Sequence, residues 1–355
     1  MPSAARFRAT ATRLLGGLAL ILTPSLSSAS PATVSPEQGY DRGELNTPRA
    51  MAMGGAQNAL GVSTTGLYLN PANLPFARVY HIEASGMLSP EARRQTYGGA
   101  VVDSVLNRFG LSAGFAGNWS ISDPDAVKRT WIDLRLSIAI PLGDRFAIGM
   151  TGRFLRAEQA VGKGPLGESL ASDGTPDKTV VNAPTVDLGF TAAFTKEFRL
   201  GVVGHNLSNP GNAFLPTSLA AGLGYGSREF SIEAGAHIDF TTFGKPKVRA
   251  MGGAELFILD RLAIRAGYRY DDGFRTHAVS LGLGYIDRKW SIELSGRRDI
   301  VGDLQGTQTV LSLRYFYDAT GVNDEPDPQS ASIRPVPNAK LVARSSNRER
   351  GMDRR

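Results

Sequence analysis

The 355-residue chain contains no cysteine and only 4 histidines. Without cysteine it can form neither disulfide bonds nor thiolate metal sites, and it has no cysteine nucleophile. Beyond residues 1–29, no stretch approaches the roughly 18 consecutive apolar residues that a transmembrane helix needs. Any part of the mature chain that spans a membrane must therefore consist of strands.

The chain also lacks a concentrated basic surface, although its formal net charge is +6. Residues 1–29 carry three Arg and no acid, and residues 321–355 carry seven Lys or Arg against five acids. The remainder carries 29 basic and 28 acidic residues. This nearly neutral body argues against a nucleic-acid partner.

Residues 1–29 are predicted to be a secretory signal peptide. Arg6, Arg8 and Arg13 form a basic start, Leu14 to Leu22 is a short apolar run, and Ser27-Ser28-Ala29 provides small residues at the cleavage position. The alternative is a buried N-terminal helix. Export is the better interpretation, because the apolar run is too short to span a bilayer as a helix.

Residues 79–317 alternate between apolar and polar residues with a period of two. Over Trp131–Leu142 the even-numbered residues are Ile or Leu, whereas the odd-numbered ones include Asp133, Arg135 and Ser137. This pattern is typical of strands with one apolar and one polar face. A soluble sandwich would show it too.

Two further features favour a bacterial outer-membrane barrel over a sandwich. Short breaks such as 143–145 and 287–289 alternate with longer polar loops such as 156–182, and membrane barrels have this asymmetry between short periplasmic turns and long external loops. Aromatic residues also gather beside the short turns, as in a girdle at one membrane interface.

The alternation predicts about fourteen strands, an even number as in other single-chain barrels. With an even count, both ends of the barrel chain face the periplasm. The second segment is weak, so twelve strands is an alternative. The last segment ends on an aromatic pair, as in the signal read by the outer-membrane assembly machinery, which is an expected partner beside outer-membrane lipid. The expected strands are 79–88, 96–103, 109–119, 131–142, 146–155, 184–195, 198–206, 216–225, 230–240, 247–257, 262–270, 276–285, 290–297 and 307–317.

The most specific local pattern precedes these strands. Residues 48–56 read PRAMAMGGA, and residues 64–74 read TTGLYLNPANL. The two stretches resemble the N-terminal segment of the FadL-like long-chain fatty-acid transporter superfamily and of its PorV-type relatives, in which "R-x-x-x-M-G-G-A" and "x-N-P-A-x-L" precede a fourteen-stranded barrel. Here Ser63-Thr64-Thr65 stands where members carry acidic residues. The matching residues are Arg49, Met53, Gly54, Gly55, Asn70, Pro71, Ala72 and Leu74.

The resemblance implies an all-β transmembrane antiparallel barrel whose residues 30–78 form a plug or hatch. Gly54-Gly55 permits tight backbone packing, and Asn70 before Pro71 favours an extended or turn conformation. Such a segment can fold inside the barrel, or it can cap the periplasmic rim instead. Residues 318–355, rich in Pro, Ser, Asn and Arg, are predicted to be a disordered periplasmic tail that is a tether or contacts peptidoglycan or a partner.

The polar faces of the strands predict a charged lumen of eight Arg and six acids. Unpaired charges away from water are costly, so structural ion pairs are a better interpretation than a selectivity ring. Met87, Met251 and Phe257 are candidates for an apolar patch inside. The charges are Asp133, Arg135, Arg153, Asp187, Arg199, Glu233, Asp239, Arg249, Glu255, Arg265, Arg269, Glu293, Arg297 and Arg314.

Apolar cargo would need a way out of such a lumen. In the FadL-like group it leaves sideways through a strand kink, and glycine within a strand favours a kink or bulge. The candidates are Gly98 with Gly99, and Gly252 with Gly253. The alternative is that these glycines make room for the plug.

The resemblance implies a channel for hydrophobic small molecules. The alternative is a PorV-like protein that does not transport but docks exported proteins or secretion machinery. We do not expect an enzyme, a cofactor or a metal site, because His205, His237 and His277 lie on separate strands and Asp123-Pro124-Asp125 and Asp271-Asp272-Gly273 are ordinary turn sequences.

Overall fold

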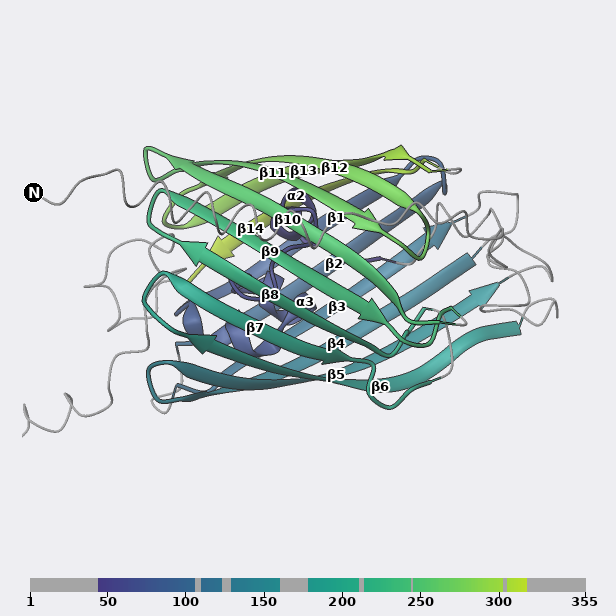
Figure 1. Ribbon diagram of the computed structural model, residues 1–355, viewed down its shortest axis with the longest axis horizontal. Helices are drawn as coiled ribbons and strands as arrows, with labels where there is room; N and C mark the ends of the chain where they lie inside the picture. Colours follow the sequence, from purple (N-terminus) through teal and green to yellow (C-terminus); the bar gives the residue numbers. More distant parts are fainter. Residues whose placement is uncertain are drawn as a thin grey trace, which may run out of the picture. The chain divides into compact units, whose positions relative to one another are not determined.

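The computed structural model describes residues 44–105, 110–122, 129–159, 178–210, 214–243, 245–302 and 305–317. The predicted signal peptide and the predicted tail lie outside these residues. The described chain forms one closed antiparallel barrel in which each strand pairs with its sequence neighbours and β1 pairs with β14 (Figure 1). No described helix is both long and apolar enough to cross a bilayer.

The strand count of fourteen is confirmed, and the weak second segment is a regular strand. The bounds are β1 Tyr80–Ser89, β2 Arg94–Asp103, β3 Ser112–Ser122, β4 Arg129–Leu142, β5 Phe146–Gln159, β6 Lys178–Ala193, β7 Phe198–His205, β8 Ser218–Gly226, β9 Phe230–Asp239, β10 Lys247–Ile258, β11 Leu262–Asp271, β12 Thr276–Ile286, β13 Trp290–Val301 and β14 Thr307–Phe316.

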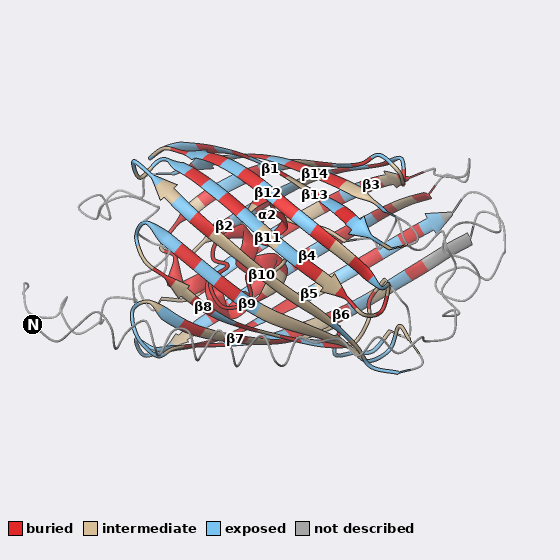
Figure 2. Cartoon of the chain, turned by 45° about the horizontal axis from the view of Figure 1, so that its top comes forward, coloured by how far each residue is buried: buried red, intermediate tan, exposed pale blue. Residues whose placement is uncertain are grey.

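The alternation places the two kinds of side chain on opposite sides of the wall. Along β4, Ile132, Leu134 and Leu136 are exposed on the outer face, whereas Asp133 and Arg135 are buried in the lumen. Figure 2 shows the same alternation of exposed and buried residues along most strands. The apolar residues therefore cover the outside of the barrel, and the polar ones form its core.

The first and last strands meet at the rim of the barrel that carries the short turns. β1 begins where β14 ends, and the amide of Tyr317 donates to the carbonyl oxygen of Tyr80 at 2.9 Å. The rings of the same two residues lie 5.1 Å apart. The even strand number thus places the first and last strand ends at the same rim.

The segment before β1 lies inside the barrel and consists of three short helices. They are α2 Pro48–Ala52, α3 Thr64–Leu69 and the 3₁₀ helix η2 Pro71–Phe76. α2 contacts β11 to β14, α3 contacts β2 to β4, and η2 contacts β3 to β6. Figures 1 and 2 show these helices as a buried body within the wall, which we call the plug (residues 44–79).

Candidate functional site

The first half of the plug motif forms a tight turn against β10 and β11. Gly54 and Gly55 have φ values of +68° and +93°, a region that side chains with a Cβ atom rarely adopt. A Cβ on Gly54 would lie 2.6 Å from the carbonyl oxygen of Tyr268. Met53 is fully buried. The motif glycines therefore allow the plug backbone to touch the wall.

The second half of the motif attaches the plug to β6. The Asn70 side-chain oxygen caps η2 by accepting from the Ala72 amide at 3.1 Å. Its Nδ2 donates to the carbonyl oxygen of Asn58 at 2.8 Å and to Thr191 Oγ1 at 3.1 Å. Pro71, Ala72 and Leu74 are buried beside it. The structure thus places both halves of the predicted motif in the lumen rather than at the rim.

Inward-facing glycines of the wall leave the space that the plug occupies. A Cβ on Gly149 would lie 2.5 Å from the Ala72 amide nitrogen, and one on Gly267 would lie 2.3 Å from the Gly54 nitrogen. Such distances are shorter than real Cβ contacts, so a side chain there would force the plug to move. The same holds for Gly114 on β3, Gly189 on β6, Gly201 on β7, Gly224 on β8, Gly253 on β10 and Gly282 on β12.

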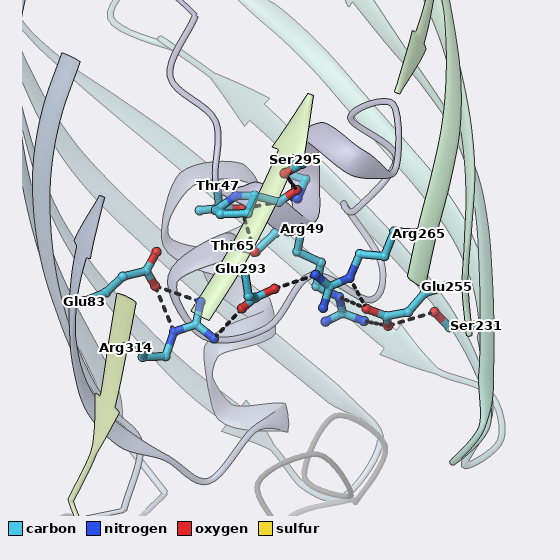
Figure 3. Close-up of polar contacts among 12 residues, drawn as sticks. Thr47, Arg49, Thr65, Glu83, Ser231, Glu255, Arg265, Glu293, Ser295 and Arg314 are labelled. Atoms are coloured by element: carbon cyan, nitrogen blue, oxygen red, sulfur yellow. Dashed lines mark hydrogen bonds and ion pairs between the residues drawn. The ribbon is translucent and has the colours of Figure 1, made fainter. Parts of the chain in front are cut away.

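A chain of ion pairs joins the plug to β10, β11, β13, β14 and β1 (Figure 3). Arg49 of α2 donates to both oxygens of Glu255, at 2.7 and 3.2 Å. Arg265 then bridges Glu255 and Glu293. Arg314 continues the chain, pairing with Glu293 at 3.2 Å and with Glu83 at 2.8 Å. Alternating charges therefore run around this side of the lumen without a gap.

The other predicted lumen charges form further clusters. Glu44, at the start of the plug, pairs with Arg249 at 3.1 Å, Arg269 at 3.0 Å and Arg297 at 2.9 Å. Sequence reasoning missed this residue, because it precedes the motif and has no strand neighbours. Asp133 pairs with Arg135 and Arg153, Asp187 contacts His205, and Glu233 accepts from the amides of Ala59 and Leu60.

Arg135 also holds an aromatic residue of the plug. Its guanidinium carbon lies 4.6 Å from the ring centre of Tyr68, whose hydroxyl donates to Asn118 Oδ1 at 2.8 Å. Burial raises the pKa of the Tyr68 phenol, although Arg135 acts in the opposite direction. The phenol therefore stays protonated and keeps its hydrogen bond.

The predicted kinks are absent from both glycine pairs. Gly98 and Gly99 keep their register with both β1 and β3, and Gly252 and Gly253 keep theirs with both β9 and β11. The prediction fails because one glycine of each pair points inward, where Gly98 faces Asn118 and Gly253 faces the Met53 backbone. Within the described ladders, the register shifts instead at Ala157/Glu158 and at His277/Ala278.

The predicted inner apolar residues pack against the plug. Met87 contacts Met51 and Val310, and Phe257 packs against a cluster that includes Val62 and Phe316. Met251 would meet a Cβ on Gly55. These side chains therefore support the plug.

A different apolar cluster, which sequence reasoning missed, lines the lumen at the long-loop end. Its buried members Trp131, Leu155, Ala157 and Val181 come from β4, β5 and β6, and Leu215 comes from the connection between β7 and β8. We call these five residues the vestibule. Their signal in the sequence was an apolar side chain on the inward parity, as at Trp131, two residues before Asp133.

Among the described residues, the ladder between β6 and β7 is short beside the vestibule. β6 has 16 residues, but only six of them, Leu188–Ala193, pair with β7. β7 ends at His205, and Asn206 turns the chain with a φ of +53°. Beyond that turn Ser208 Oγ donates to Thr185 Oγ1 at 2.8 Å. We call the edge of β6 beyond its β7 ladder, facing this connection, the notch.

The histidines and acidic pairs weighed above have ordinary partners where they are described. The His205 and His237 rings lie 6.2 Å apart, and His277 contacts Tyr268. Asp271 pairs with Arg249, and Asp272 pairs with Lys247. The Asp123-Pro124-Asp125 turn lies outside the described residues.

Neither protein-family models nor curated proteins match this sequence. Among solved structures the chain is similar to the CymD monoaromatic hydrocarbon channel, with 14% identity, a TM-score of 0.57, and 77% of this chain and 97% of that chain covered. It is also similar to the Ralstonia pickettii toluene transporter TbuX (13%, TM-score 0.56, 77% and 98%) and to a Pseudomonas aeruginosa FadL homologue (14%, TM-score 0.55, 77% and 98%). The chain has the fold of the FadL-type channels. The resemblance stated from the plug motif is thus confirmed for the fold.

Proposed function

We propose that this protein resides in a bacterial outer membrane. It lets small apolar molecules pass from the long-loop end of the lumen to the outer face of the barrel. The apolar outer face of the strands supports the location, since lipid-facing and lumen-facing residues alternate in such barrels. The short-turn rim, with both barrel ends, faces the periplasm in this proposal. Transport by the similar structures, whose names describe hydrocarbon channels, supports the apolar cargo.

The observation that carries the proposal is the vestibule, an apolar cluster of the lumen that contains no plug residue. The inward parity of β4 carries Asp133 and Arg135 deeper in the barrel and Trp131 nearer the long-loop end, where Arg129 is the last inward residue. Leu155 and Val181 continue the apolar surface across the next two strands. These side chains are buried against one another, so an apolar ligand enters by displacing part of the cluster, and removal of its own surface from water favours that exchange.

The route beyond the vestibule runs sideways through the notch. The centre of the barrel is occupied by the plug and by paired charges, and a bare apolar molecule would desolvate those charges without compensating them. At the notch no strand ladder joins the described residues. The segment after β7 is held to β6 by the Leu207 amide, which donates to the Val186 carbonyl oxygen at 2.8 Å, and by Ser208 Oγ, which donates to Thr185 Oγ1. The exposed side chain of Leu207 lies next to it on the outer face. Cargo therefore leaves towards the apolar outer surface.

A disulfide across the notch tests this route. The chain has no natural cysteine, so Thr185→Cys with Ser208→Cys introduces a single pair, and their oxygens already lie 2.8 Å apart. The matched control is Ser137→Cys with Thr151→Cys, whose oxygens lie 2.7 Å apart across the continuous β4 and β5 ladder. The assay is uptake of labelled toluene by cells that produce each variant, with and without reductant.

We expect oxidation to lower uptake through the notch variant at least fivefold, and reduction to restore it. The control variant should transport equally in both states. Equal uptake by the oxidised and reduced notch variant contradicts the sideways route. Uptake no higher than in cells without the protein contradicts transport altogether.

A second function, docking of exported proteins in the PorV manner, is favoured by the fixed plug. The plug touches the wall through glycines on eight strands and through ion pairs at Arg49 and Glu44, so it can serve as a rigid base. Two measurements together distinguish the two functions. A docking protein retains exported proteins on affinity purification from its own cells and shows no toluene uptake, whereas the passage shows the reverse.

A further inference from the structure

Arg199 differs from the other arginines predicted to face the lumen. Seven of those eight contact a carboxylate: Arg135, Arg153, Arg249, Arg265, Arg269, Arg297 and Arg314. Arg199, the second residue of β7, forms no ion pair with any described acid, and its buried Nη1 has no hydrogen-bond partner there. It is only 2% exposed.

Within the described part of the chain, the contact that orients the Arg199 side chain is aromatic. Its guanidinium carbon lies 4.6 Å from the ring centre of Phe76, the last residue of η2. A guanidinium is always charged in proteins, and a buried charge without a partner is costly. Stacking on a ring compensates only a small part of that cost. The side chain is therefore held in place and still able to bind an anion.

Arg199 lines a cavity of about 260 Å³ at the short-turn end of the barrel. The turns after β4 and β6 contribute Arg145 and Lys196, so three cations face one acid, Asp144. Phe76 and Phe194 give the cavity apolar walls. Two further cavities among the described residues are smaller, at about 70 and 20 Å³. Positive charge, aromatic surface and volume thus coincide at one place.

We propose that this cavity binds a small monocarboxylate with an aromatic or branched apolar body. Arg199 receives the carboxylate, since the guanidinium fork matches two carboxylate oxygens, and Arg145 and Lys196 add to the attraction. The apolar body lies between Phe76 and Phe194. A cavity of about 150 Å³ holds benzene, so the volume here suits a ring with a carboxylate. The site lies at the opposite end from the vestibule and does not depend on the proposed passage.

Equilibrium dialysis of the full-length protein in a non-ionic detergent tests the site, with labelled benzoate as the probe. Arg199→Gln removes the charge, Arg199→Lys keeps it without the fork, and Phe194→Ala removes an exposed wall of the cavity. The matched control is Arg261→Gln, an exposed arginine on a different short turn. A heat-modifiable shift on gels verifies that each variant is folded.

We expect Arg199→Gln to weaken benzoate binding at least tenfold, Arg199→Lys to have an intermediate effect, and Arg261→Gln to have none. Phe194→Ala should weaken benzoate binding and leave acetate binding unchanged. Absence of benzoate binding by the native protein overturns the proposal, as does equal binding by folded Arg199→Gln. If benzyl alcohol displaces labelled benzoate as effectively as unlabelled benzoate does, the negative charge of the ligand has no role in binding. If inorganic phosphate displaces labelled benzoate as effectively as unlabelled benzoate does, the site does not select a carboxylate with an apolar body.

Discussion

Glu255 of β10 binds the plug and two neighbouring strands at once, so Glu255→Gln tests how the plug is attached. Glu255 accepts from Arg49 of the plug through two hydrogen bonds, from Arg265 of β11, and from Ser231 Oγ of β9 at 3.2 Å. Its side chain is 1% exposed, so water screens these contacts little. Glutamine keeps the shape and leaves two arginines without their shared charge.

Removing one partner from a buried ion pair costs about 3–5 kcal/mol. Arg265 still pairs with Glu293, and Arg49 is 13% exposed, so we expect the lower part of that range, about 3 kcal/mol. That value corresponds to roughly a hundredfold change in the unfolding equilibrium. The control is Asp260→Asn, which breaks an exposed pair with Arg228 and should cost no more than about 1 kcal/mol.

The measurement is urea unfolding in lipid vesicles, followed by tryptophan fluorescence, with the single variants and the double variant Arg49→Gln/Glu255→Gln. Because the double variant leaves no unpaired Arg49, it should be less destabilised than the sum of the two single variants. A Glu255→Gln loss as small as that of Asp260→Asn would show that the ion-pair chain does not stabilise the plugged barrel. Strict additivity would show that Arg49 and Glu255 do not interact.

Three further changes have expected outcomes. Gly267→Val should displace the plug and raise planar-bilayer conductance, because even a Cβ would lie 2.3 Å from the Gly54 nitrogen. Gly296→Val should not, because a Cβ there would lie 3.8 Å from its nearest neighbour, the Gln308 carbonyl oxygen. Deletion of residues 40–75 should leave a heat-modifiable barrel with higher conductance, and unchanged conductance would argue against a plug. Burial opposes ionisation of Glu91, but hydrogen bonds from Thr307 and Arg298 outweigh it and lower its pKa. The stability advantage of the native protein over Glu91→Gln should therefore be present above about pH 5 and disappear as the pH falls through the lowered pKa.

The fold was predictable because its signal is local. A period of two over ten residues defines a strand and the face that each side chain occupies, whatever the partner strand. The assignment of Asp133, Arg135 and Glu255 to the lumen needed nothing more, and the structure agrees with it. The fourteen strands follow in the same way, and only their ends differ: β5 and β13 continue to Gln159 and Val301, whereas β6 stops at Ala193, two residues before the predicted end.

The partners of those charges were not predictable, because they are distant in sequence. Arg49 and Glu255 are 206 positions apart, and Glu44 meets three arginines on three strands. The notch also depends on a relation between segments that are distant in sequence. β7 ends before the turn at Asn206, whereas the longer β6 starts well before its ladder with β7. The alternation predicts each strand separately from the others. The ion-pair partners and the notch arise from the way in which strands of unequal length align.

The glycine pairs show how a correct local observation led to a wrong prediction. In a strand, adjacent residues face opposite sides, so a pair of glycines always places one inside and one outside. The inner ones, Gly98 and Gly253, lie against Asn118 and the Met53 backbone, while the outer ones leave the ladder intact. Glycines on the inward parity of successive strands therefore predict a body packed inside the barrel, and a lateral opening is better sought where one strand outlasts its neighbour.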